Sequence, residues 1–223
     1  MNCCRTANET FTGTDSFFTK LSRRHLKKFR RKGLANEQRM LREGIGSVGI
    51  SEASILEIGS GIGALHLTLL QDGASRATGI DIAEGMIATS RMLSQELKLG
   101  DRVTYHQGDF LRCSSEMQMA DIILLDKVVC CYEDVDTLVE KSLALSDRIY
   151  AVSMPRSRWW LKMLISIPVI LGTTFRWSFH PYWHDWNRIQ LRIQSSGFIQ
   201  RYSNHTMLWE VCVYERALDA RLS

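Results

Sequence analysis

Short apolar runs alternate with amphipathic stretches over most of the chain. Beyond Gly49, five short runs are rich in apolar residues that do not alternate with charged ones, which is the pattern of strands buried on both faces. These runs are Ile55–Ile58, Ala77–Ile80, Val103–His106, Asp121–Leu125 and Ile149–Ser153. Helical periodicity follows the first, second and fourth runs, at residues 64–71, 84–97 and 134–145. Buried strands that alternate with helices predict an α/β fold, with a parallel sheet covered on both sides.

The two ends of the chain depart from this alternation. Near the N-terminus, apolar residues recur at three- and four-residue steps from Phe17 to Arg31, which predicts an amphipathic helix ending at Gly33. A second helix is predicted from Asn36 to about Gly44. Near the C-terminus, the pattern predicts a helix at 185–196 and then two strands, Phe198–Tyr202 and Met207–Tyr214, joined as an antiparallel hairpin through the polar link 203–205. We therefore expect a helical cap at 1–46 and an α/β domain at 47–223.

Residues 156–190 form a distinct insert in this scheme. Five of the six Trp and two of the three Pro fall within them. Their longest apolar stretch, Met163 to Gly172, is interrupted by Ser166 and Pro168 and is too short to cross a bilayer. The insert is thus expected to pack as part of the α/β domain or to rest on a membrane interface.

Charge is unevenly distributed along a chain of otherwise ordinary composition. With 45% hydrophobic and 23% charged residues, the chain is neither disordered nor a disulfide scaffold. Residues 20–43 hold ten bases and two acids, although the formal net charge of the whole chain is only +4. The basic segment is read first as a solvated helix face and second as a contact for an anionic membrane surface or an acidic substrate. Nucleic acid is not expected as a partner, because no recognised module accompanies the bases and the rest of the chain is mildly acidic.

Cysteine spacing and the N-terminus bear on metal sites and location. Two pairs of the six cysteines are sequence neighbours, Cys3 with Cys4 and Cys130 with Cys131, and no C-x-x-C motif occurs. No metal site is therefore predicted. The N-terminus lacks the layout of a signal peptide, so a cytoplasmic protein is expected, with peripheral membrane contact left open.

A glycine-rich turn follows the first predicted strand. Gly59-Ser60-Gly61-Ile62-Gly63 would let the backbone approach a ligand closely and lead into a helix whose N–H groups favour an anionic group. Asp81 ends the second strand 22 residues after Gly59, where a carboxylate can accept both hydroxyls of a ribose. With Ala64, the turn also fits the dinucleotide pattern, and NAD enzymes place an acid near the same spacing. These two features alone leave the ligand undecided, and Asp81 could instead be a helix N-cap.

Two further positions help to decide which ligand the turn would bind. Glu57 places a carboxylate inside a strand that is otherwise built for burial, and an unpaired buried charge costs several kcal/mol. Its partner is expected to be a cationic or amino group of a ligand, or else an N-terminal base such as Arg31 or Arg39. Asp109-Phe110, after the third strand, offers an acceptor for an exocyclic amine and an aromatic face for a purine.

Together these residues resemble the class I S-adenosylmethionine (SAM)-dependent methyltransferase family, from about residue 50 to 214. The likeness extends to the magnesium-protoporphyrin O-methyltransferase-like branch through the basic N-terminal helix, residues 126–132 and residues 209–214. It implies a Rossmann-like fold with a seven-stranded, mostly parallel sheet, a C-terminal antiparallel hairpin and SAM as cofactor. The cofactor-binding residues that it implies are Glu57, Gly59, Ser60, Gly61 and Gly63 at the methionine part, Asp81 at the ribose, Ile82, Met86, Asp109 and Phe110 at the adenine, and Asp126 and Lys127 near the sulfonium.

The resemblance predicts an enzyme that moves a methyl group to an O, N or S atom of a small molecule. In the family, the position of the 156–190 insert often forms part of the acceptor pocket, and its aromatic residues favour an aromatic or apolar acceptor, with a porphyrin-like molecule as one option. Tyr132, His180 and His184 are the candidates for orienting or deprotonating the acceptor, although each could be purely structural. Two alternatives stay open: a SAM-binding regulatory module without turnover, and an NAD-linked oxidoreductase.

Overall fold

The computed structural model describes residues 9–156 and 182–217. Its α-helices are α1 (Glu9–Lys32), α2 (Asn36–Val48), α3 (Ala64–Gln71), α4 (Glu84–Glu96), α5 (Phe110–Cys113), α6 (Val135–Ala144) and α8 (Trp186–Ser195). Its strands are β1 (Ser54–Ile58), β2 (Arg76–Asp81), β3 (Val103–Gln107), β4 (Ala120–Asp126), β5 (Ser146–Pro155), β6 (Phe198–His205) and β7 (Trp209–Arg216). Short 3-10 helices lie at Gly100–Arg102, Ser114–Glu116 and Val129–Cys131.

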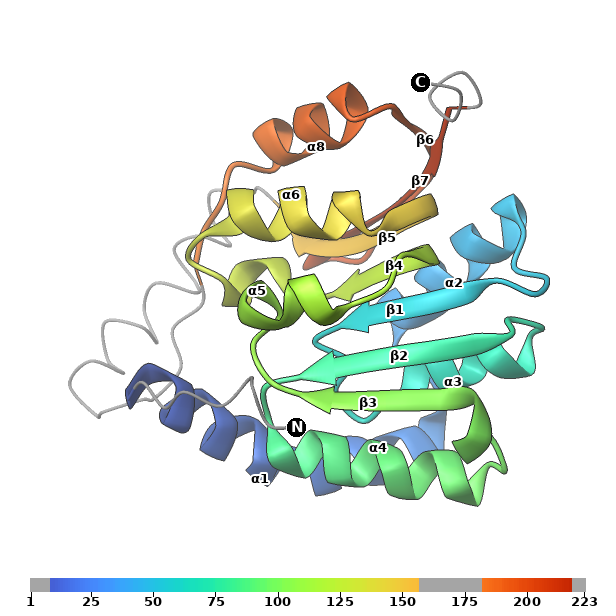
Figure 1. The fold of residues 1–223 in the computed structure, drawn as a ribbon, viewed down its shortest axis with the longest axis vertical. Helices are drawn as coiled ribbons and strands as arrows, with labels where there is room; N and C mark the ends of the chain where they lie inside the picture. Colours follow the sequence, from blue (N-terminus) through green and yellow to red (C-terminus); the bar gives the residue numbers. More distant parts are fainter. Residues whose placement is uncertain (1–8, 157–181, 218–223) are drawn as a thin grey trace.

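The strands form one seven-stranded sheet in the order β3-β2-β1-β4-β5-β7-β6 (Figure 1). The first five strands are parallel, whereas β7 is antiparallel to both β5 and β6. The order reverses at β1, so β1 and β4 mark the switch point at which open α/β sheets bind ligands. The predicted Rossmann-like, mostly parallel sheet with a C-terminal antiparallel hairpin is confirmed.

Helices cover both faces of the sheet, which gives each face its own hydrophobic core. Along β4, Ile122 and Leu124 point into the core shared with α2, α3 and α4, while Ile123 and Leu125 point into the core shared with α6 and α8. All four side chains are fully buried. Because neighbouring side chains of a strand point to opposite faces, a run that is apolar at every position is what a strand between two helical layers requires.

The two N-terminal helices pack on the same side of the sheet as α3 and α4. α1 lies against α4, where the Thr19 hydroxyl accepts a hydrogen bond from the Gly85 N–H (3.0 Å) and Arg30 pairs with Glu96 (2.6 Å). α2 crosses β7 and β5 and buries Leu41 completely. α1 therefore reaches the carboxyl-terminal edge of the sheet, whereas α2 packs across β5 and β7 on the same face (Figure 1).

Several predicted boundaries need correction. α2 continues to Val48, four residues beyond the predicted end. The polar link predicted at 203–205 is wrong, because those residues belong to β6 and the chain turns at 206–208. The reason is that β6 is an edge strand with mostly exposed side chains, so polar residues are tolerated in it. Most of the aromatic insert, at 157–181, lies outside the described residues.

Candidate functional site

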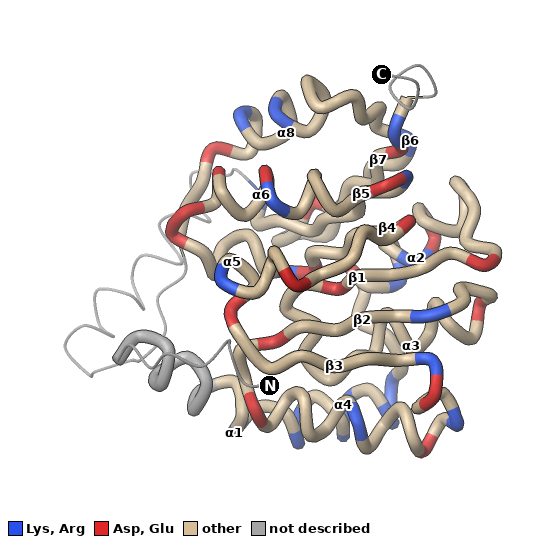
Figure 2. The backbone as a smooth tube through the Cα atoms, viewed as in Figure 1, with Lys and Arg blue, Asp and Glu red and all other residues tan. Residues whose placement is uncertain are grey.

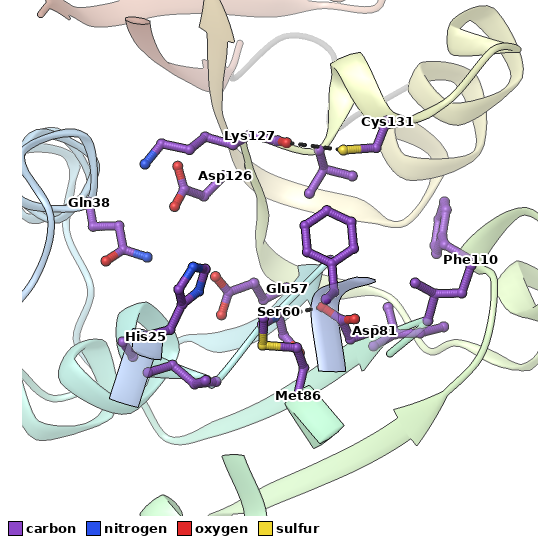
Figure 3. Close-up of a pocket in the computed structure, with 18 of the residues that line it drawn as sticks. His25, Gln38, Glu57, Ser60, Asp81, Met86, Phe110, Asp126, Lys127 and Cys131 are labelled. Atoms are coloured by element: carbon purple, nitrogen blue, oxygen red, sulfur yellow. Dashed lines mark hydrogen bonds between the residues drawn. The ribbon is translucent and has the colours of Figure 1, made fainter. Parts of the chain in front are cut away.

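A cavity of about 570 Å³ lies at the carboxyl-terminal ends of β1 to β4, where the cap helix α1 covers it (Figure 3). Its volume suits a small organic ligand. All of the cofactor residues predicted from the sequence line it except Gly63. They are Glu57, Gly59, Ser60, Gly61, Asp81, Ile82, Met86, Asp109, Phe110, Asp126 and Lys127.

The glycine turn is tied directly to the end of β2. The Asp81 carboxylate accepts hydrogen bonds from the Gly61 N–H (2.7 Å) and from the Ala83 N–H (2.8 Å). Asp81 is not the N-cap of α4, because Ala83 occupies that position. Gly61 has a left-handed φ of +54°, and a Cβ built on it meets nothing within 4 Å, so its backbone faces open space in the cavity wall. A side chain there would be strained and would project into ligand space.

Two neighbours in this turn show how tightly it is built. The Ser60 hydroxyl oxygen is buried without a hydrogen-bond partner among the described residues. Such an orphaned polar atom is costly unless something pairs with it. Gly63 ends the turn at φ +78°, and a Cβ there would lie 2.8 Å from the His66 ring. Gly63 therefore supports the turn by admitting His66 rather than by lining the cavity.

Glu57 has a protein partner that the sequence did not reveal. One carboxylate oxygen lies 2.5 Å from Nδ1 of His66, whose Nε2 is 3.1 Å from the Tyr105 hydroxyl. Glu57 and His66 are 2% and 0% exposed. Burial raises the pKa of Glu57 although the His66 hydrogen bond opposes the shift, and burial raises the pKa of Tyr105 to about 12. The N-terminal base alternative is wrong, since Arg39 binds the Leu34 carbonyl (3.0 Å) instead.

Acidic residues follow β2 and β3 on the same edge of the sheet (Figure 2). Asp109 caps α5 by accepting from the Leu111 N–H (3.0 Å), and Phe110 is buried beside it. Tyr132 lines the cavity nearby, and burial, followed by the charge of Asp109, raises its pKa well above the usual value. At neutral pH the Tyr132 phenol is therefore an uncharged hydroxyl that can orient an acceptor but does not act as a base.

The end of β4 connects the cavity to both the cap and the hairpin. Asp126 accepts a hydrogen bond from the Ser153 hydroxyl (2.6 Å), and the same hydroxyl accepts one from the Lys127 N–H (2.9 Å). Lys127 has a left-handed φ of +61°, which is uncommon outside glycine. Its ammonium group lies 3.1 Å from the Glu37 carboxylate of α2 and 5.4 Å from the centre of the Trp209 ring. This strained lysine therefore links α2, β4 and β7.

The two predicted catalytic histidines have different outcomes. His180 lies outside the described residues. His184 does not line the cavity, and its Nε2 donates a hydrogen bond to the Tyr132 carbonyl (2.8 Å). Its ring stacks on Tyr182, which does line the cavity. In this arrangement, His184 fixes the chain between Tyr132 and Tyr182 rather than meeting a ligand.

The sequence did not show which side chains of the cap would reach the cavity. α1 contributes Phe18, His25, Lys28 and Phe29, and α2 contributes Gln38. The helical period predicted α1, but it did not indicate which part of the apolar stripe would cover the sheet edge. Among the described residues, no cluster of three or more His, Cys, Asp or Glu is placed to hold a metal ion. In the same part of the chain, no helix combines the length and apolar character that a membrane span requires.

Comparison with known proteins bears on this site. Residues 55–145 match the family described as "Methyltransferase domain". Among solved structures, the chain is similar to magnesium protoporphyrin IX methyltransferase from Synechocystis PCC 6803 with bound S-adenosylhomocysteine (SAH), at a TM-score of 0.71 and 18% identity, covering 92% of this chain and 99% of that one. A search of curated protein sequences gives no significant match.

Two other structures share the fold at lower identity. A putative sarcosine dimethylglycine methyltransferase from Galdieria sulphuraria has a TM-score of 0.65 and 12% identity, covering 81% of this chain and 85% of that one. An O-methyltransferase family 2 protein from Planctomyces limnophilus in complex with apigenin has a TM-score of 0.58 and 13% identity, covering 83% and 63%. The resemblance predicted from the sequence is thus confirmed: residues 55–145 match the methyltransferase-domain family, and the chain has the fold of class I SAM-dependent methyltransferases.

Proposed function

We propose that this protein transfers a methyl group from SAM to an O, N or S atom of a small, flat and largely apolar acceptor. The observation that carries the proposal is the meeting of three sequence features at one cavity. Glu57 from β1, the Gly59–Gly63 turn and Asp81 from β2 were expected to face a common sulfonium nucleoside, and both carboxylates line the cavity beside that turn.

The residues present fit SAM. Asp81 keeps acceptor capacity for ribose hydroxyls next to the open backbone of Gly61. The unpartnered Ser60 hydroxyl in the cavity wall would gain a hydrogen-bond partner from a polar ligand group. Glu57 and Asp126 bring negative charge toward the centre of the cavity, where a sulfonium or ammonium group would be stabilised. Asp109 and Phe110 remain the proposed adenine contacts.

SAM would supply an electrophilic methyl group, which passes in line to the acceptor atom as the sulfonium S–CH3 bond breaks and SAH leaves. The chain's contribution is to hold donor and acceptor collinear and to exclude water, an effect worth up to about 7–11 kcal/mol in favourable intramolecular systems. Phe18 and Phe29 of α1 close the cavity on one side and supply apolar walls. The neutral Tyr132 hydroxyl can orient an acceptor. A carboxylate acceptor needs no general base, whereas a phenol or an ammonium does.

The acceptor class follows from the aromatic lining. Phe18, Phe29, Phe110, Tyr132 and Tyr182 come from different elements but border the same cavity. Aromatic walls favour flat ligands because ring faces stack with little loss of side-chain freedom. A porphyrin-like acceptor is one candidate, and a flavone is another, since the Synechocystis protein is named for a magnesium porphyrin and the Planctomyces protein is in complex with apigenin.

The N-terminal charge supports a membrane contact. We expect a cytoplasmic protein that touches anionic membranes through the basic face of α1 and the tryptophan-rich insert. Flotation with vesicles that contain phosphatidylserine tests the membrane contact: the protein should rise with the vesicles at low salt and stay behind at high salt. If it fails to float at low salt, the membrane contact is excluded.

Calorimetry with SAH and with NADH tests the proposed function. SAH should bind, whereas NADH should not, and Asp81→Ala and Gly61→Val should each abolish SAH binding. Asp72→Ala serves as a matched control, because Asp72 pairs with Arg42 on the surface away from the cavity. Tight NADH binding without SAH binding would establish the oxidoreductase alternative.

Turnover separates an enzyme from a binding module. The protein is incubated with methyl-labelled SAM and protoporphyrin IX, its magnesium complex or apigenin, and the product mass is read. Methylated product is expected from at least one acceptor, and SAH binding without product from a broad panel of flat acceptors would favour the regulatory module.

A further inference from the structure

Three basic side chains line the end of the cavity that the cap helix covers. His25 and Lys28 of α1 line the cavity one helical turn apart, and Lys127 lines it from the end of β4. In Figure 3, His25, Gln38 and the side chain of Lys127 lie on one side of the cavity, with Asp81 and Phe110 on the other. The carboxylate of Asp126 lies beside the Lys127 side chain, and that of Glu57 lies next to the His25 ring. The cap end of the cavity therefore gathers three basic side chains, while Asp126 and Glu57 bring carboxylates from the strand ends.

The positive charge at this end of the cavity is only partly neutralised by the protein. Lys127 is paired with Glu37, but no carboxylate of the described residues lies within 4 Å of His25 or Lys28. The sequence of residues 157–181 contains three bases and no acid, so this segment cannot supply a carboxylate either. Burial lowers the pKa of His25, and the charges of Lys28, Lys127 and Arg24 lower it further. Mutual repulsion among these groups indicates a local positive potential, which favours an anion.

Other bases on α1 do not share this position. Lys27 and Arg31 are exposed and do not line the cavity, as is usual for a solvated helix face. Lys28 and His25 are also exposed, but both border the cavity, which Lys27 and Arg31 do not. With its pKa lowered, the His25 ring is neutral at pH 7 and offers an N–H donor beside the Lys28 charge. A carboxylate, with two acceptor oxygens, matches one ring N–H and one ammonium group.

We propose that His25 and Lys28, with Lys127 on the same side of the cavity, form a carboxylate-binding subsite at the cap end. The inference rests on the proposed function and adds a specificity element to it. Two sources could supply the carboxylate: the amino-acid end of SAM itself, or an acidic group on the methyl acceptor. The chemistry of recognition is the same in both cases, so the source is settled by choosing probes that differ only in the relevant carboxylate.

The first arm tests the amino-acid end of the cofactor. Calorimetry measures the affinities of SAH and of 5′-methylthioadenosine, a thioether nucleoside without the amino-acid portion, for wild type, His25→Gln and Lys28→Gln. Lys27→Gln is the matched control, because it removes the same charge from the same helix outside the cavity. If the cofactor supplies the carboxylate, Lys28→Gln should raise the Kd of SAH about fivefold, as for a partly exposed charge pair, and leave the nucleoside unaffected.

The second arm tests the acceptor. With SAH at saturation, binding of protoporphyrin IX, which carries two carboxylates, is compared with binding of apigenin, which carries none. If the acceptor supplies the carboxylate, Lys28→Gln should weaken porphyrin binding by a similar factor and spare both SAH and apigenin. Circular dichroism of each variant verifies that α1 and the sheet remain folded.

The outcomes separate this proposal from the proposed function. If wild-type protein binds no SAH, the proposed function itself fails. If SAH binds, but Lys28→Gln and His25→Gln change neither SAH nor porphyrin affinity beyond the Lys27→Gln control, the subsite is refuted alone. Equal losses for probes with and without the carboxylate would also overturn it, since they would show a general effect of α1 on the cavity.

Discussion

Replacing His66 by Leu should expose how much of the site depends on one buried pair. The substitution removes the partner 2.5 Å from the Glu57 carboxylate and leaves that carboxylate between two packed layers. Glu57 is 2% exposed, so water cannot take over from the imidazole without opening the core. The predicted consequence is a large loss in the free energy of unfolding at neutral pH.

The size of that loss has an upper limit set by proton uptake. A buried carboxylate without a partner escapes its desolvation cost by becoming neutral. At pH 7, protonating a group with an ordinary pKa near 4.5 costs about 3.4 kcal/mol, at about 1.36 kcal/mol per pH unit. At pH 5 the same step costs only about 0.7 kcal/mol. Because the pKa of Glu57 is already raised in the wild type, part of this cost is present before the substitution. We therefore expect His66→Leu to lose between about 1 and 3 kcal/mol at pH 7, and less than about 1 kcal/mol at pH 5.

Urea unfolding followed by circular dichroism at the two pH values measures the loss. For a chain of this length, about 3 kcal/mol corresponds to a fall in Tm of roughly 6–12 °C at pH 7. Thr68→Val is the matched control on α3, because the Thr68 hydroxyl only bonds back to the Ala64 carbonyl (2.8 Å), and it should cost under about 1 kcal/mol at both pH values. A His66→Leu loss below about 1 kcal/mol at pH 7, or one that does not shrink at pH 5, would refute the reasoning.

Three further predictions follow from single contacts. Because burial raises the pKa of Glu57, the folded state binds its proton more tightly than the unfolded state does. This stabilisation is fully present at acid pH and is lost as the pH rises above about 4.5 through the folded pKa. The free energy of unfolding of Glu57→Gln should therefore increase relative to wild type between pH 4.5 and 7, as measured by parallel urea titrations. Ser60→Ala should leave the Tm nearly unchanged, since the hydroxyl lacks a partner among the described residues, yet weaken SAH binding about fivefold by calorimetry; unchanged affinity would remove Ser60 from the site. Tyr150→Phe should cost about 1 kcal/mol in urea unfolding, because it leaves the buried Ser142 hydroxyl without its 2.8 Å partner, and no change at all would contradict that hydrogen bond.

Most of the fold could be predicted because the central strands of the parallel sheet, β1, β2, β4 and β5, are largely buried on both faces, whereas β3 lies at the edge. Such strands read as continuous apolar runs, and each predicted run of β1 to β5 overlaps the observed strand. The hairpin was harder to delimit, because its edge strand β6 exposes alternate side chains and includes polar Ser203 and Asn204. There the polar residues that signal a turn are equally compatible with an edge strand, so composition alone misplaced the link.

The cofactor side of the site could be predicted for a related reason. Its residues stand at fixed distances from strand ends, so finding the strands located Glu57, Gly61, Asp81 and Asp109 at one sheet edge. His66 escaped the same reasoning because it lies within an apolar helix, nine residues from Glu57, where a lone histidine gives no sign of its partner. The only indication in the sequence was that a buried Glu57 needs a partner, and a ligand or an N-terminal base was predicted to supply it.

The acceptor side depends on a different kind of information, and the cap shows why. His25 and Lys28 belong to a run of bases that differ little in type, and only the packing of α1 on α4 distinguishes the members that face the cavity from those that face solvent. A rotation of α1 by one residue, about 100°, would present different side chains without altering its helical pattern. Contacts such as Thr19 with Gly85 and Arg30 with Glu96 fix that rotation. Which cap side chains face the cavity is therefore encoded in tertiary contacts at the α1–α4 interface, and we expect substitutions there to change ligand affinity without altering the glycine turn.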